Sequence, residues 1–187
     1  MRHVISALVM NEPGVLANVA GMFAARGFNI DSLVVGRTEN PDLSRMTIVV
    51  NADDNTVEQV RKQLAKLVPV VGLHDFQGTA YVESDLMLMT LTAAPDKRNE
   101  IISLVNVFEG KITDVSPITM MIELSGAEEK LERFIELMRP YGIEELARTG
   151  VIAMARGSQP LRNEVGASKK LRERKLDAPA AAALPPS

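Results

Sequence analysis

The same order of strand and helix patterns occurs twice along the chain, and this repeat restricts the folds that the chain can adopt. In the first copy, β-branched or alternating apolar residues predict strands at residues 3–10, 29–39, 45–51 and 70–76. In the second copy, the strands are expected at residues 86–92, 111–116, 119–125 and 142–154. Each copy also has two apolar stripes of helical period, one after the first strand and one after the third. Both copies therefore have the order β-α-β-β-α-β.

The helices of the first copy are bounded by clear local signals. The turn Asn11-Glu12-Pro13-Gly14 comes directly before an apolar stripe that includes Val15, Val19 and Phe23 and stops at Gly27. The second helix is expected to be capped by one residue of the polar run 53–56. The order β-α-β-β-α-β is the split βαβ, or ferredoxin-like, plan. We therefore predict an α+β protein with two ferredoxin-like domains in tandem, at residues 1–78 and 84–157.

Composition narrows the class of protein. The 187 residues are 46% hydrophobic and 24% charged, which is typical of a soluble globular chain. The net charge of -3, the low aromatic content of 4% and the lack of Trp argue against a nucleic-acid surface. The lack of Cys excludes disulfides and fits a reducing cytoplasm, and no signal peptide or membrane span is expected. We therefore expect a cytoplasmic protein with no nucleic-acid or membrane partner.

The last part of the sequence, residues 158–187, has a different character. It contains the basic cluster KKLRERK at residues 169–175 and ends in an Ala- and Pro-rich stretch, without a sustained apolar face. Such a composition cannot bury enough apolar surface to fold, so a disordered tail is predicted. The basic cluster is interpreted as a solvated charged segment, and binding of a phosphate-rich partner is the alternative.

Residues that carry catalytic chemistry are scarce. His3 and His74 lie on strands of the first domain that can be neighbours, but no further ligands occur at suitable spacing, and we interpret both as partly exposed sheet residues rather than a metal site. The sequence has neither a GxSxG nucleophile elbow nor a GxxxxGK[ST] phosphate loop. Glu128, Glu129 and Glu132 are spaced like a solvated helix face. No catalytic residue and no metal ligand is therefore predicted.

The turn before the first helix offers a different kind of site. The first amides of a helix have no partner within the helix, and the helix dipole makes this end electropositive. The amides of Gly14, Val15 and Leu16 can therefore receive a carboxylate, with Gly14 allowing close approach and Pro13 stiffening the turn. The alternative is that Pro13-Gly14 only makes a tight connection, and the residues alone do not decide between the two.

Neighbouring residues indicate what such a site would hold. Asn11 and Asn29, at the end of the first strand and the start of the second, offer amides for the ammonium or carboxylate of an amino acid. Val15, Leu16 and Ile30 would favour an aliphatic side chain. An aliphatic amino acid is therefore the ligand that these residue types suggest.

Three segments carry a resemblance to a known family. They are NEPGVLANVAGMFAARGFNIDSLVVGRTENPDLSRMTIVV, VEQVRKQLAKLV and ELARTGVIAMARG. The sequence over residues 1–157 resembles the small regulatory subunit of acetolactate synthase (acetohydroxyacid synthase). The resemblance implies an N-terminal ACT domain, which binds valine or another branched-chain amino acid at a dimer interface, and a C-terminal ACT-like domain.

The resemblance also implies effector-binding residues. The family's contacts correspond to Asn11, Gly14, Val15, Leu16, Asn29 and Ile30. In the second copy, Ala94-Pro95-Asp96 stands where the first has Glu12-Pro13-Gly14, and no asparagine corresponds to Asn11. One effector site per chain is therefore expected.

The function that the resemblance implies is regulatory. Such a chain forms a homodimer, holds no cofactor, activates a large catalytic subunit and confers feedback inhibition by valine or another branched-chain amino acid. Thiamine diphosphate, Mg and FAD are expected on that catalytic partner. One alternative is an ACT-type sensor for another enzyme or a transcription factor, although the sequence has no clear helix-turn-helix pattern. The other is a small enzyme in its own right, which would need a catalytic constellation that the sequence lacks.

Overall fold

The structure is a computed structural model, and it describes residues 1–157. The N-terminal domain consists of β1 (Arg2–Met10), α1 (Val15–Ala24), β2 (Ser32–Arg37), β3 (Leu43–Asn51), α2 (Asp54–Leu64) and β4 (Val70–Asp75). Its strands form an antiparallel sheet in the order β2-β3-β1-β4. This order has β2 at one edge and β4 at the other, as the ferredoxin-like plan requires.

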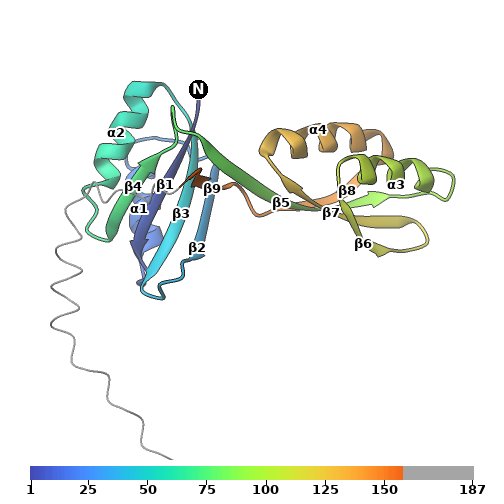
Figure 1. Cartoon of the computed structure of the whole chain (residues 1–187), viewed down its shortest axis with the longest axis horizontal. Coiled ribbons are helices and arrows are strands. Elements are labelled where there is room, and N and C mark those ends of the chain that lie inside the picture. Colours follow the sequence, from blue (N-terminus) through green and yellow to red (C-terminus); the bar gives the residue numbers. More distant parts are fainter. Residues whose placement is uncertain (158–187) are drawn as a thin grey trace, which may run out of the picture.

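The C-terminal domain repeats this arrangement. Its elements are β5 (Tyr81–Thr92), α3 (Arg98–Val107), β6 (Lys111–Val115), β7 (Thr119–Gly126), α4 (Glu128–Met138), a 3-10 turn (Arg139–Tyr141), β8 (Ile143–Arg148) and β9 (Ile152–Ala155). The main sheet has the order β6-β7-β5-β8, with α3 and α4 on one face (Figure 1). The predicted fold class, two ferredoxin-like domains in tandem, is confirmed. The boundaries at residues 1–78 and 84–157 stay a prediction, and the tail at 158–187 lies outside the described residues.

Each domain has its own apolar core between its sheet and its two helices. In the N-terminal domain, alternate residues of β1 such as Ile5 and Ala7 pack under Val19 and Phe23 of α1 and Leu64 of α2. In the C-terminal domain, the largest fully buried side chains come from strands and helices alike: Met87, Met89, Leu91, Ile101, Met120, Ile122 and Phe134. Burial of these side chains supplies most of the stabilisation of each domain.

Local chemistry explains where the helices begin. Asp53 caps α2 by accepting a hydrogen bond from the Thr56 amide at 2.9 Å, so it is the capping residue in the predicted polar run. By contrast, α1 follows Gly14, whose φ of 84° lies in the left-handed region, and α1 has no side-chain cap. The two helices of the N-terminal domain therefore begin in chemically different ways.

The last predicted strand, at residues 142–154, is two strands in the structure. β8 and β9 are separate strands: β8 pairs with the second half of β5, and β9 pairs with its first half. The break occurs because the Gly150 amide and the Thr149 hydroxyl donate to the carboxylate of Asp85, and Gly150 has a φ of +86° that a continuing strand does not allow. β5 accordingly begins at Tyr81 rather than near residue 86.

The ribbon of β5 and β9 covers the helix-free face of the N-terminal sheet. Val151 and Ala153 form a buried cluster there with Val4, Val49 and Phe76, and each of the five is at most 3% exposed. Both faces of the N-terminal sheet are therefore buried in its centre, which explains why β1 shows a run of buried residues rather than alternation.

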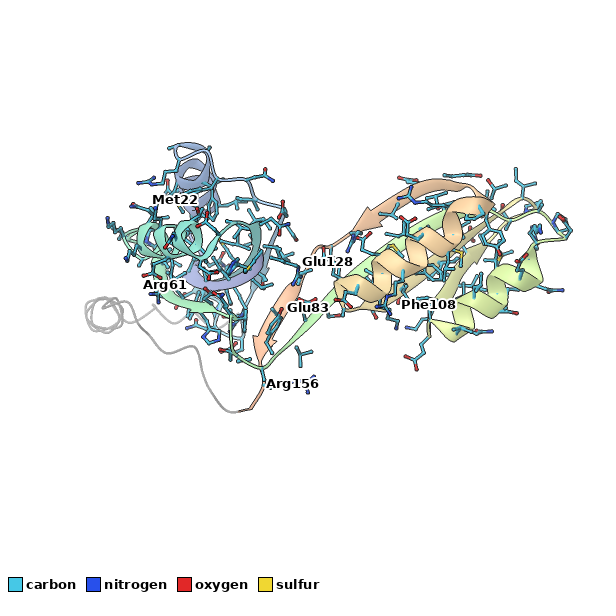
Figure 2. The ribbon with its side chains drawn as sticks, turned by 90° about the horizontal axis from the view of Figure 1, so that it is seen from above. Met22, Arg61, Glu83, Phe108, Glu128 and Arg156 are labelled. Atoms are coloured by element: carbon cyan, nitrogen blue, oxygen red, sulfur yellow. The ribbon has the colours of Figure 1, made fainter. Side chains whose placement is uncertain are left out.

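An arginine from the first strand joins the two domains at their surface. Arg2 Nη2 lies 3.0 Å from Glu83 of β5, and Arg2 Nε lies 2.8 Å from Glu128 of α4. Figure 2 shows Glu83 and Glu128 at the junction between the domains. Burial alone would lower the pKa of Arg2, but the hydrogen bond and charge of Glu83 and the charge of Glu128 outweigh burial and raise it. Glu128 therefore forms an ion pair with Arg2, whereas the sequence predicted that it belongs to a helix face exposed to solvent.

Candidate functional site

The turn from β1 to α1 has the open helix end that the sequence predicts. Gly14 takes the position before the helix, the first turn of α1 contains no acidic residue, and a Cβ at Gly14 would have no heavy atom within 4 Å. The Asn18 amide donates to the Gly14 carbonyl at 2.9 Å, which starts the helical hydrogen bonds. The space next to Gly14 is therefore open, and the start of α1 has no acidic side chain in its first turn that would compete with an anion.

The other residues of this turn have distinct surroundings. Asn11 is exposed; its Nδ2 donates to the Pro41 carbonyl at 2.9 Å, and its backbone amide donates to the Asp42 carbonyl at 2.8 Å. The side chain of Val15 is buried in the core, and its backbone amide donates a long hydrogen bond of 3.4 Å to the Glu12 carbonyl, which a ligand would have to replace. Leu16 is 48% exposed and is the apolar side chain available to a ligand at this end. We call Asn11, Gly14, Val15 and Leu16 the loop group.

Asn29 and Ile30, which we call the strand group, precede β2. The exposed Asn29 donates from Nδ2 to Asp31 Oδ1 at 3.0 Å, and Ile30 packs partly buried against the core. The Asp31 amide donates to the Val49 carbonyl at 2.9 Å. The strand group is therefore fixed to the C-terminal end of β3.

The loop group and the strand group lie at opposite ends of the N-terminal sheet. Val49, which anchors the strand group, pairs with Val4 near the start of β1, whereas Asn11 follows its end. Seven steps along the chain separate Val4 from Asn11, or about 24 Å at the rise of an antiparallel strand. The structure thus does not bring the six predicted residues together within one chain, because α1 runs back along the sheet before β2 begins.

The two histidines differ from each other, and only His3 differs from the prediction, because His74 is a partly exposed residue of β4. His3 is buried, not partly exposed, and its Nε2 lies 3.5 Å from Asp54 Oδ1 at the start of α2. His74 pairs with Ser6, so both side chains lie on the face of the sheet opposite to that of His3. On this face, the centroid of the His74 ring lies 4.7 Å from that of Phe76. Because successive strand residues alternate between faces, His3 and His74 cannot share a metal ion. Over residues 1–157, no group of three or more His, Asp or Glu side chains has a geometry that could hold one.

A polar cluster that the sequence did not predict lies beside the junction. Asp85 of β5 is 2% exposed and accepts hydrogen bonds from Arg148, the Thr149 hydroxyl and the Gly150 amide. Arg148 also donates to Glu132 of α4. The only sequence signal for this cluster is a charged residue at the start of an apolar strand, which is too weak to identify it.

Two family models match most of the described chain. The model described as the small subunit of acetolactate synthase matches residues 84–157, and the AHAS small subunit-like ACT domain matches residues 5–72. The probable acetolactate synthase small subunit of Archaeoglobus fulgidus is 54% identical over 85% of this chain and 99% of that protein. The chain belongs to the acetolactate synthase small-subunit family. The family resemblance seen in the sequence is thereby confirmed.

Further relatives extend this result to the three-dimensional fold. The acetolactate synthase small subunit of Mycolicibacterium smegmatis is 44% identical over 89% of this chain and 96% of its own length. The crystal structure of the acetolactate synthase small subunit from Thermotoga maritima matches with a TM-score of 0.77 and 45% identity, over 85% of this chain and 99% of that one. Within residues 1–157, no helix is long and apolar enough to cross a membrane.

Proposed function

We propose that this chain is the noncatalytic regulatory subunit of acetolactate synthase. It forms a homodimer in the cytoplasm, binds the large catalytic subunit and raises its activity, and it returns that subunit to low activity when valine or another branched-chain amino acid binds. Thiamine diphosphate, Mg and FAD are held by the catalytic partner in this account, and no residue of this chain contributes to them. Family membership of both domains favours this assignment over a sensor for another enzyme.

The observation that carries the proposal is the separation of the loop group from the strand group. An effector that contacts both groups must lie between two chains. β2 is an edge strand with the sequence SLVVGR, which has no charge before Arg37 and so presents a free edge for strand pairing. A twofold antiparallel pairing of two β2 strands places the start of one beside the end of the other.

This pairing would assemble the site from two chains. The end of β2 leads into the turn at residues 38–42, and this turn holds Asn11 through the Pro41 and Asp42 carbonyls. The strand group of the partner chain precedes its own β2 and therefore approaches this turn and the loop group. The carboxylate of the effector binds the amide end of α1, and the aliphatic side chain contacts Leu16 and the partner's Ile30.

The expected affinity is modest. Hydrogen bonds to a charged group contribute about 1.5 to 3 kcal/mol each, and the charge effect at a helix end contributes about 0.3 to 2 kcal/mol. A carboxylate held by two or three amides, minus the cost of association, corresponds to dissociation constants of about micromolar to millimolar.

Calorimetric titration of the full chain with valine, leucine, isoleucine and glutamate tests the proposal. We expect an aliphatic amino acid to bind and glutamate not to bind. In Gly14→Asp, the new carboxylate should repel the effector and abolish binding and feedback inhibition, while activation of the catalytic subunit remains. Gly14→Asn is the matched control, because Asn tolerates the left-handed backbone but adds no charge. If Gly14→Asp bound valine as well as the unmodified chain, the site assignment would be wrong.

A further inference from the structure

The turn between β8 and β9 rests directly on edge strand β2. The Val151 amide donates to the Ser32 hydroxyl oxygen at 3.3 Å. A Cβ on Gly150 would lie 2.6 Å from Ser32 Oγ and 2.9 Å from Val34 Cγ2, distances that real Cβ atoms do not reach. Only glycine therefore fits at position 150, and the turn and β2 cannot move independently without breaking this contact.

On one side, the contact is close to the strand group. Ser32 follows Ile30 by two residues and pairs with Val49, whose carbonyl also accepts the Asp31 amide. Val49 in turn packs against Val151 in the buried cluster under the β5–β9 ribbon. A displacement of residues 29–32 is therefore transmitted to Val151 through both a hydrogen bond and a packing contact.

On the other side, the turn is fixed to the C-terminal domain. Asp85 accepts the Gly150 amide at 3.0 Å and the Thr149 hydroxyl at 3.2 Å, and it pairs with Arg148 at 2.7 Å. Arg148 continues the contacts to Glu132 of α4. Because Asp85 is buried, these bonds hold the turn firmly against β5 and α4.

We propose that residues 149–151 carry the effect of the bound effector from the N-terminal domain to the C-terminal domain. The inference rests on the proposed function, because it takes the effector to bind beside Ile30. An effector changes an equilibrium only as far as it binds one arrangement more tightly than another. In this proposal, the two arrangements differ in the contact between β2 and the turn at residues 149–151. The contacts of this turn with Asp85, and of Asp85 with Arg148, connect that change to α4.

Hydrogen exchange of the full chain, with and without valine, tests this inference. In the unmodified protein, saturating valine should change the exchange rate of the Val151 region by about fivefold or more, the lower end of usual coupling between sites. Ser32→Ala removes the acceptor of the Val151 amide without adding bulk. This variant should still bind valine by calorimetry but lose most of the exchange response, and valine should inhibit the holoenzyme less completely.

A pair of glycine variants provides the matched control. Gly150→Ala places a methyl group against Ser32 and Val34, whereas Gly157→Ala has a similar positive φ, +77°, with open space around it. Both variants therefore carry comparable backbone strain, but only Gly150→Ala should weaken valine inhibition of the holoenzyme. Circular dichroism melts of both variants check that the fold is intact.

The outcomes separate this inference from the proposed function. If valine binds the unmodified chain but leaves the exchange of residues 149–153 unchanged, the inference is overturned and the proposed function stands. The same holds if Ser32→Ala keeps the full exchange response. If no aliphatic amino acid binds the unmodified chain, in calorimetry or in the holoenzyme, the proposed function fails and the inference fails with it.

Discussion

Asp85 and the partly exposed Arg148 form an ion pair, with 2.7 Å between Asp85 Oδ2 and Arg148 Nη2. The Asp85 side chain is 1% exposed, and its second oxygen accepts the bonds from residues 149 and 150. Burial alone would lower the pKa of Arg148, but the hydrogen bonds that it donates to Glu132 and Asp85 outweigh burial and raise it. The pair thus fixes the end of β8, the following turn and the centre of β5 in one arrangement.

Loss of this carboxylate should be costly. Asp85→Ala leaves the Gly150 amide without its acceptor and removes the buried partner of Arg148, so we expect the free energy of unfolding to fall by about 2 to 4 kcal/mol. Urea denaturation followed by circular dichroism measures this change. Glu145→Ala on the exposed surface of β8 is the control and should change stability by less than about 0.5 kcal/mol. Equal effects of the two variants would contradict the structural role of Asp85.

The cap of α2 makes part of the stability depend on pH. The hydrogen bonds from the Thr56 amide and hydroxyl lower the pKa of Asp53 below its ordinary value of 3.8. A carboxyl with a lowered pKa stabilises the fold fully above its unfolded pKa, and this contribution is lost as the pH falls through its folded pKa. Asp53→Asn keeps an acceptor without the charge. Its stability, from thermal melts between about pH 6 and pH 3, should therefore fall less with acid than that of the unmodified chain.

The exposed edge of β2 should determine the oligomeric state. Val35, at the centre of this strand, is 41% exposed, and pairing about a twofold axis brings two copies of the strand centre together. Val35→Lys should weaken dimerisation by about tenfold or more, since it places two like charges near the axis and blocks strand pairing. Sedimentation velocity measures this change. Val68→Lys, at a position that is 79% exposed in a turn, should remain dimeric, and a dimer of Val35→Lys as tight as this control would exclude the β2 interface.

The order of the elements was predictable because its signals are local. The apolar stripe of α1, the polar cap before α2 and the β-branched run of β3 each depend on residues close in sequence. The split between β8 and β9 was not predictable in the same way. It depends on Asp85, more than 60 positions earlier, whose burial becomes evident only when β5 and β8 pair. Likewise, the burial of His3 depends on the placement of α2 above β1.

The sequence predicted local features of the turn before α1, but not the distance between the loop group and the strand group. The positive φ of Gly14 and the exposure of Leu16 agree with what the motif suggests about an open helix end. From the sequence, Asn11 and Asn29 are expected to lie close together because one ends a strand and the other begins the next. In a βαβ unit, however, the helix returns along the sheet, so these two positions lie at opposite ends, and only pairing between chains can bring them together.

Valine binding to a mixed dimer tests whether two chains share each effector site. One chain carries Gly14→Asp and the other carries Asn29→Ala, and two different affinity tags isolate the mixed dimer. If each site combines the loop group of one chain with the strand group of the other, one site holds both substitutions and the second site is intact. We therefore predict one valine bound per mixed dimer by calorimetry and none bound by either parent dimer. No binding to the mixed dimer, with both parents folded and dimeric, would contradict a site shared between chains.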